Sequence, residues 1–204
     1  MKYVRIAGIE GVITIQKEMD SGSMFSYHFS RSKPGDPVKA AAGTEIITEG
    51  SRLGLDYLPV ILLGLGGGFE DSSDLIRQQR ALIERQEKNG DHFIVIGLHT
   101  GAAKERASLE KAMEAEYGDK YINLREYMCG QGMEDLSRLT NGKIRPAAKD
   151  EEMISDGMTP SCVLDEDGIY LNRYGYELLG RLVYDRMDAL GYFDELKEVL
   201  GREP

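Results

Sequence analysis

The sequence predicts an α/β fold in which helices cover a parallel sheet, preceded by a small β-rich subdomain. Short β-rich runs separated by turn residues occupy residues 1–50. From residue 51 onward, unbroken apolar runs alternate with segments whose apolar residues recur at helical spacing. Such strand–helix alternation is typical of a three-layer α/β domain with a parallel sheet. We therefore expect two parts, a β-rich subdomain at residues 1–50 and an α/β domain at residues 51–204.

Three runs of β-forming residues predict the strands of the subdomain, at residues 4–7, 12–15 and 25–29. Glycines and the Asp-Ser-Gly-Ser sequence at 20–23 separate these runs, and such residues favour turns over strands. The Pro-Gly-Asp-Pro sequence at 34–37 marks a further loop. Strands this short indicate a sheet built from hairpins.

Two apolar runs predict the central strands of the parallel sheet. Residues 59–65 and 92–98 are mostly apolar, which is the pattern of strands buried on both faces of a sheet. A third, shorter strand is predicted at 120–123.

Three helices are predicted between and after these strands. Their apolar residues recur every three to four positions, and capping residues mark their ends. The first begins at Ser72 or Ser73 and ends at Asn89-Gly90, the second spans 103–117 before Gly118, and the third spans 172–190. Residues 130–160 are polar and broken by glycines and prolines, so we expect one helical turn there, near 149–154.

Composition and charge restrict the classes of partner. With 41% apolar and 29% charged residues, the chain is typical of a soluble globular protein. Its formal net charge of −10 argues against a nucleic acid or an anionic membrane as partner. Cys129 and Cys162 lie far apart in the sequence without a Cys/His cluster, so we expect no metal site and no other cofactor. Whether these two thiols pair stays open.

Localisation is predicted from the N-terminus. Residues 1–6 lack the continuous apolar core of an export signal, and no stretch of the chain approaches 18 apolar residues. The sequence as written is therefore predicted to be cytoplasmic. If the natural N-terminus lies upstream, the expectation is an extracellular or cell-surface protein.

The most informative motif lies at residues 167–180. It reads Asp-Gly-Ile-Tyr-Leu-Asn-Arg-Tyr-Gly-Tyr-Glu-Leu-Leu-Gly. This segment resembles the last signature block of the SGNH (GDSL-type) esterases and lipases, Asp-x-x-His-x-Asn-x-x-Gly-Tyr. The resemblance implies a three-layer, flavodoxin-like parallel sheet and the chemistry of serine ester hydrolysis. It gives Asp167 the role of the acid that serves the catalytic histidine, but Tyr170 stands at the histidine position.

Two other segments extend the resemblance. Residues 60–67 are similar to the third block of the family, where an Asn side chain helps to line the oxyanion hole, and Gly66 stands at that Asn position. Residues 1–50 are similar to a β-rich insertion of some bacterial members. The nucleophile block Gly-Asp-Ser is missing, because serine follows none of the Gly-Asp pairs, at Gly35-Asp36, Gly90-Asp91 and Gly118-Asp119.

The missing groups decide what the resemblance implies for function. A serine hydroxyl needs a positioned base, and the pKa of tyrosine, near 10, leaves it neutral and unable to act as histidine does at pH 7. We therefore expect an SGNH-like protein that has lost standard ester hydrolysis, with Asp167 as a vestige. We expect it to bind a small-molecule or carbohydrate ligand in a cleft near Gly66, Gly67, His99, Tyr170 and Asn172.

Two alternatives stay open. The retained Asp167 and its block also fit an active esterase of small or carbohydrate esters, with a rebuilt or completed catalytic site. The chain also fits one part of a larger assembly, because the first strand of the family has no counterpart here. A sheet without an outer strand exposes backbone edge groups. This second alternative predicts a homo-oligomer or a strand-completing partner.

Other candidate groups have simpler interpretations. His99 follows a predicted buried strand, at the end where open α/β sheets collect ligands. His28 and His92 lie in or beside predicted strands and are interpreted as structural. Residues 64–69 do not complete a dinucleotide-binding G-x-G-x-x-G motif, because Phe69 takes the sixth position. A glycine-rich turn is predicted there instead.

Overall fold

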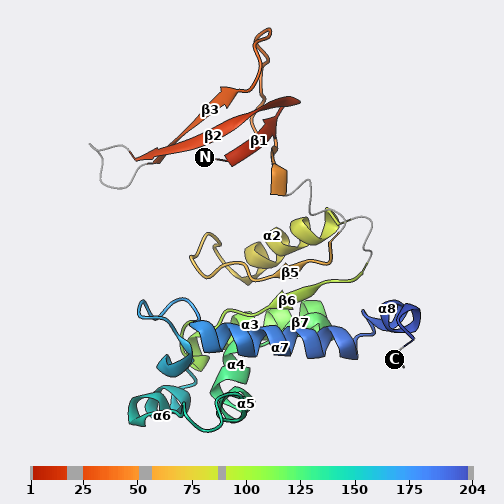
Figure 1. The fold of residues 1–204 in the computed structure, drawn as a ribbon. Coiled ribbons are helices and arrows are strands. Elements are labelled where there is room, and N and C mark those ends of the chain that lie inside the picture. Colours follow the sequence, from red (N-terminus) through yellow and green to blue (C-terminus); the bar gives the residue numbers. More distant parts are fainter. Residues whose placement is uncertain (1, 18–24, 51–56, 87–90, 202–204) are drawn as a thin grey trace. The chain divides into compact units, whose positions relative to one another are not determined.

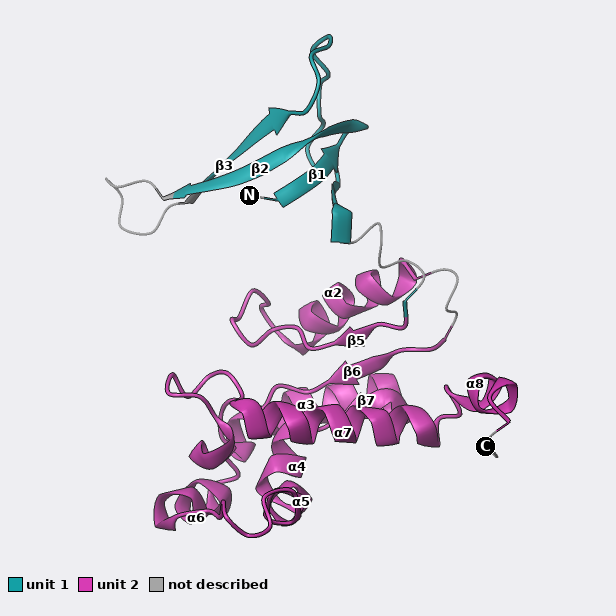
Figure 2. Cartoon of the chain, viewed as in Figure 1, with its two compact units in different colours: residues 1–57 teal, residues 58–204 magenta. Residues whose placement is uncertain are grey.

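The structure is a computed structural model of the chain (Figure 1), and it describes residues 2–17, 25–50, 57–86 and 91–201. The chain divides into two compact units, unit 1 at residues 1–57 and unit 2 at residues 58–204 (Figure 2). The sequence places this boundary at 50/51. The predicted turn at 20–23 and the predicted helix end at Asn89-Gly90 lie outside the described residues.

Unit 1 contains a small antiparallel sheet. Its strands are β1 (Lys2–Ile6), β2 (Ile9–Lys17), β3 (Phe25–Arg31) and β4 (Ile46–Thr48). They lie in the order β3-β2-β1-β4, and each neighbouring pair is antiparallel. Ala7 and Gly8, with φ of 48° and 80°, turn β1 directly into β2. Positive φ at both central residues is what the commonest two-residue hairpin loop requires.

Unit 2 holds a three-stranded parallel sheet. Its strands β5 (Val60–Ile61), β6 (Ile94–Ile96) and β7 (Tyr121–Ile122) lie in the order β5-β6-β7. Both pairs are parallel. All three strands are shorter than the runs that predict them. After β5 the chain turns at Gly64, whose φ of 106° is a conformation that favours glycine, so the apolar residues 62–65 form a loop.

Seven described α-helices belong to unit 2. They are α2 (Ser72–Glu84), α3 (Ala103–Tyr117), α4 (Leu124–Cys129), α5 (Gln131–Leu139), α6 (Ala148–Ser155), α7 (Arg173–Ala189) and α8 (Asp194–Val199). The three predicted helices correspond to α2, α3 and α7. The N-cap of α2 is Asp71 and not Ser72 or Ser73, because the Asp71 carboxylate accepts from the Asp74 N–H at 2.9 Å. The helical turn predicted near 149–154 corresponds to α6, but α5, which also lies in residues 130–160, was not predicted.

Helices pack on both faces of the parallel sheet (Figure 1). Val95 and Tyr121 point to one face and pack in a cluster with Ile83 of α2 and Met113 of α3. Ile94, Ile96 and Ile122 point to the other face and pack with residues of α4, α5 and α7, among them Leu124, Leu136 and Leu178. This alternation follows from the two-residue period of a strand. The chain is thus a mixed α/β protein with one antiparallel and one parallel sheet.

The two edges of the parallel sheet differ. Beside β7, the Arg186 guanidinium of α7 donates from Nη1 to the main-chain oxygens of Tyr121, at 2.8 Å, and Asp119, at 2.5 Å. Among the described strands β5 pairs with β6 alone, and Val60 is 43% exposed. A strand-completing partner at β5 stays a prediction.

Candidate functional site

The carboxyl edge of the parallel sheet brings together most of the residues that the sequence singles out. The loop after β5 contains Gly66 and Gly67, and the segment after β6 contains His99. A third segment, residues 164–171, reaches this edge because His99 Nε2 lies 2.9 Å from the main-chain oxygen of Ile169. Open α/β sheets bind ligands at this edge. We call these three segments the carboxyl-edge site.

His99 is the histidine of this site. It is 1% exposed, and its Nε2 must carry the proton because a carbonyl oxygen accepts only. Its Nδ1 is therefore a buried acceptor, and it has no hydrogen-bond partner among the described residues. Burial lowers the pKa of the ring, and the bond to Ile169 offsets this in part. His99 is thus held neutral and in one tautomer.

Asp167 caps a turn of its own chain. Its Oδ1 accepts from the main-chain N–H of Ile169 at 2.9 Å and of Tyr170 at 3.0 Å. These two bonds lower the pKa of the carboxyl group. An Asp side chain that bonds to N–H groups two residues ahead forms an Asx turn. The carboxylate therefore shapes the loop, and no side chain in the described residues donates to it.

Tyr170 follows in the same loop. Its side chain is 55% exposed, and its main-chain oxygen accepts from the Asp165 N–H at 2.8 Å. The neighbouring residue Leu171 pairs with Leu164 in an antiparallel bridge. These backbone bonds between its two arms make the loop a short hairpin, and the Tyr170 side chain is exposed on it.

Asn172 joins this hairpin to α7 with both ends of its amide. As the N-cap of α7, its Oδ1 accepts from the N–H groups of Tyr174 at 2.9 Å and Gly175 at 3.1 Å. Its Nδ2 donates to the main-chain oxygens of Cys162 at 2.9 Å and Leu164 at 3.0 Å. Both donor hydrogens and both acceptor lone pairs of the amide are thus used. Asn172 therefore positions the site and is not free to bind a ligand.

Gly66 and Gly67 lie in the loop after β5. The loop is closed by a bond from the Gly67 N–H to the Gly64 oxygen at 3.0 Å. No atom outside the neighbouring residues comes within 4 Å of a Cβ built on Gly66, Gly67 or Gly68. The loop therefore borders open space, and it presents backbone groups where the family resemblance expects an Asn side chain.

Two residues that the sequence analysis did not single out support the site through hydrogen bonds. The Thr159 hydroxyl donates to the main-chain oxygen of His99 at 2.7 Å. Asp150, 4% exposed, accepts from the Ser161 hydroxyl at 2.6 Å and the Cys162 N–H at 3.1 Å. Burial raises the pKa of Asp150, but these hydrogen bonds outweigh it and leave the pKa lowered. A single sequence carries no signal for either contact, since both partners are distant in the chain.

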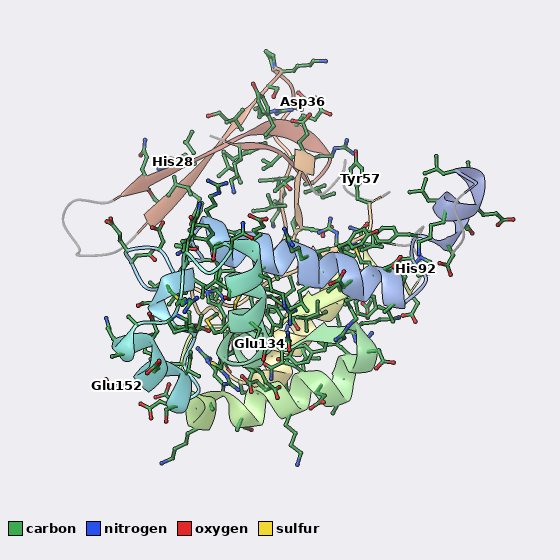
Figure 3. All side chains as sticks on the ribbon, turned by 60° about the horizontal axis from the view of Figure 1, so that its bottom comes forward. His28, Asp36, Tyr57, His92, Glu134 and Glu152 are labelled. Carbon is green, nitrogen blue, oxygen red and sulfur yellow. The ribbon has the colours of Figure 1, made fainter. Side chains whose placement is uncertain are left out.

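The other two histidines lie elsewhere. His28 is exposed on β3 of unit 1, with its Nε2 at 3.1 Å from the Ser26 hydroxyl (Figure 3). His92 precedes β6, at the opposite end of that strand from His99, and its ring lies 4.5 Å from the ring of Tyr192. Neither is part of the carboxyl-edge site.

Both cysteines are free thiols. Burial raises the pKa of Cys129, and it raises the pKa of Cys162 to about 11. Since the thiolate is the nucleophile, neither is activated for covalent catalysis.

A separate hollow of about 450 Å³ lies between α5 and α7. Asp135, Arg138 and Arg181 in its lining already form hydrogen bonds or ion pairs. Asp135 accepts from the Tyr127 hydroxyl at 2.9 Å and from Arg138 at 2.9 Å, and Arg181 donates to Glu177 at 3.0 Å. These pairs leave few free polar groups to hold a ligand.

Comparisons of the chain with protein-family models, with curated proteins and with solved structures find no match. Within the described residues, no three His, Cys, Asp or Glu side chains come together as they would around a metal ion. None of the helices in the described segments combines the length and the apolar character that crossing a membrane demands.

Proposed function

We propose that this chain is an SGNH-like α/β protein that does not hydrolyse esters and binds a small-molecule or carbohydrate ligand at the carboxyl-edge site. The state of His99 carries the proposal. Its Nε2–H is used by Ile169, and no hydroxyl of the described residues donates to its Nδ1. A serine hydrolase needs a histidine in hydrogen-bond reach of the nucleophile and oriented by a third group.

Asp167 and Tyr170 support the same conclusion. The acid of a triad must orient the ring of its histidine, but the Asp167 carboxylate is bonded to the N–H groups of its own turn. Tyr170 is neutral at pH 7 and cannot take and return a proton as histidine does. The segment thus resembles the last SGNH block in sequence but has no histidine to serve as its base.

Support for ligand binding comes from the open space and exposed groups at the same edge. A side chain built on Gly66 or Gly67 meets open space, although the Gly67 N–H is bonded to Gly64 and the Gly68 oxygen accepts from Gln78 at 2.9 Å. Tyr170, 55% exposed, offers an aromatic face and a hydroxyl, a combination that binding sites use often.

The loss of hydrolysis is tested by labelling with a fluorophosphonate probe and mass spectrometry, beside turnover of p-nitrophenyl acetate. We expect no labelled serine and no turnover above a heat-denatured control. One labelled serine with turnover would contradict the proposal and establish the active-esterase alternative. The labelled residue would then be the nucleophile.

Ligand binding is tested by NMR titration with glucose, xylobiose and their acetylated forms. We expect saturable shifts for at least one of them, lost in Gly66→Leu, which fills the open space beside the loop. Gly180→Leu is the matched control, because Gly180 also faces open space but lies on the exposed side of α7. Saturation by none of these sugars would contradict carbohydrate binding, and equal binding by both variants would place the ligand elsewhere.

A further inference from the structure

A hollow of about 340 Å³ lies in unit 2 between the end of α5 and the start of α7. It shares no lining residue with the larger hollow between the same two helices. Its volume falls at the low end of the range for small-molecule sites, roughly 300–1,000 Å³. We call it the basic hollow. Its lining includes Leu139, Lys143 and Ile144 on the α5 side and Arg173, Tyr174 and Glu177 on the α7 side.

The basic hollow has two cations without a carboxylate partner. Lys143 and Arg173 are both exposed, and neither forms an ion pair within the described part of the chain. Glu177, the acidic residue of the lining, accepts from Arg181 at 3.0 Å instead. Helix α7 has no acidic residue in its first turn, so it offers Arg173 no counter-charge there. An anion in the hollow would supply the missing counter-charge for both cations.

The surrounding sequence carries charge of the same sign. Residues 138–149 contain four Lys or Arg and no Asp or Glu, although the whole chain has 35 acidic and 25 basic residues. Arg138 pairs with Asp135 at 2.9 Å, and Arg145 donates from Nε to the Gly142 oxygen at 3.2 Å. Clefts lined by charges of one sign concentrate ions of the opposite sign. The basic hollow is therefore a place where an otherwise acidic protein attracts an anion.

We propose that the basic hollow binds the phosphate group of a small organic ligand. A guanidinium such as that of Arg173 matches two phosphate oxygens as a fork, and the Lys143 ammonium adds a point charge. Two cations balance a phosphate monoester, whose charge is about −1.5 to −2 at pH 7, better than they balance a single carboxylate. Leu139, Ile144 and the Tyr174 ring offer apolar contact to the organic part. The carboxyl-edge site is a separate site, so neither proposal rests on the other.

The test is an NMR titration of the full chain with inorganic phosphate and with glucose 6-phosphate, at pH 7.5 and constant ionic strength. We expect saturable shifts in the main-chain N–H signals of Lys143, Ile144 and Tyr174, with a dissociation constant in the millimolar range for inorganic phosphate. Sodium chloride and glucose should not reproduce these shifts. Failure of both phosphate probes to saturate overturns the proposal. Equal shifts with sodium chloride overturn it too, because the effect is then general screening of charge.

Charge-removing variants locate the site. Lys143→Gln with Arg173→Gln is expected to raise the dissociation constant for glucose 6-phosphate more than about tenfold. The matched control is Lys104→Gln with Lys111→Gln, which removes the same two charges from exposed positions of α3. We expect the control to change the dissociation constant by a factor of about two or less.

Two results with the variants contradict the proposal. If both double variants weaken binding equally, the ligand responds to net charge alone. If neither weakens it, the ligand binds at another surface. Should the site variant lose its circular-dichroism spectrum, Lys143→Gln alone repeats the test at a loop position outside the helices. We then expect a rise of at least about threefold in the dissociation constant, and an unchanged value overturns the proposal.

Discussion

The imidazole of His99 and the main-chain oxygen of Ile169 form a hydrogen bond of 2.9 Å between residues 70 positions apart. This bond ties the end of β6 to the hairpin that carries Asp167 and Tyr170. It also fixes the tautomer, so the unpartnered Nδ1 is an acceptor. Protonation of His99 would keep this bond but would place an unpaired, buried N–H at Nδ1.

We expect the protein to lose stability on mild acidification because of His99. Burial holds the folded pKa of this ring below its ordinary 6.5. The unfolded chain then binds one more proton between the folded pKa and 6.5, so the stabilisation is complete above pH 6.5 and is lost as pH falls toward the folded pKa. The slope is at most about 1.4 kcal/mol per pH unit for one proton. Urea unfolding at a series of pH values from 5 to 8 measures it.

His99→Gln is the control for this pH dependence. Glutamine keeps an N–H donor but does not titrate, so the slope between pH 5 and 6.5 should flatten. His28 and His92 stay in the variant, and their contribution cancels in the comparison. Equal slopes for the two proteins would show that His99 is not the group responsible.

Asn172 is expected to stabilise the site and α7 together. Asn172→Ala removes the N-cap, worth about 0.5–2 kcal/mol, and two donated hydrogen bonds, worth about 1 kcal/mol each. The expected loss in the free energy of unfolding is therefore about 2–4 kcal/mol. Asn172→Asp keeps the cap acceptor but sets a carboxylate against the oxygens of Cys162 and Leu164. We expect it to be destabilised as well, and a loss below about 0.5 kcal/mol in both variants would contradict this role.

Two glycines of α7 form a matched pair. A Cβ at Gly175 would lie 2.4 Å from the Val163 oxygen, whereas a Cβ at Gly180 meets nothing within 4 Å. We expect Gly175→Ala to lower the free energy of unfolding by about 1–3 kcal/mol through overpacking. Gly180→Ala should raise it by about 0.5–1 kcal/mol, since alanine is the better helix residue. Urea unfolding of both variants gives the signs, and the same sign in both would contradict the close approach at Gly175.

The elements with a strong periodic signal could be predicted from the sequence, and those set by tertiary contacts could not. The helix at 103–117 was predicted at its observed bounds because Gly118 marks its end. Helix α5 was not predicted because Gly130 and Gly132, at its start, are residues typical of loops. A Cβ at Gly132 would lie 2.8 Å from the Tyr127 oxygen, so that glycine serves close packing inside a helix. The local sequence does not distinguish such a glycine from a loop glycine.

The candidate site was predictable in position but not in chemistry. The strand-end rule placed His99 at this edge of the sheet, and the family resemblance placed the glycine loop in the same cleft. Asn172 was predicted as a cleft residue, yet its amide is used within the fold. The roles of Thr159 and Asp150 depend on hydrogen bonds between residues far apart in the chain, which a single sequence does not reveal.

The ion pair between Arg125 and Glu110 is expected to be the most costly polar contact to break. Arg125 donates from Nε and Nη2 to the two carboxylate oxygens of Glu110, at 2.5 and 2.7 Å, and from Nη1 to the Gly157 oxygen at 2.8 Å. The two side chains are 8% and 13% exposed. Because a single change leaves a buried charge without its partner, Arg125→Met and Glu110→Leu should each cost about 3–5 kcal/mol of the free energy of unfolding.

The double variant separates the interaction energy of the ion pair from the energy that each side chain contributes through its other contacts. Replacing both charges by apolar side chains leaves no unpaired charge, so Arg125→Met with Glu110→Leu should be several kcal/mol more stable than the sum of the single changes predicts. Urea unfolding of the four proteins in this cycle measures the coupling. Additive single changes would mean that water screens the pair in solution. Strong coupling would instead identify this contact as the link that holds α3, α4 and the segment after α6 together beneath the site.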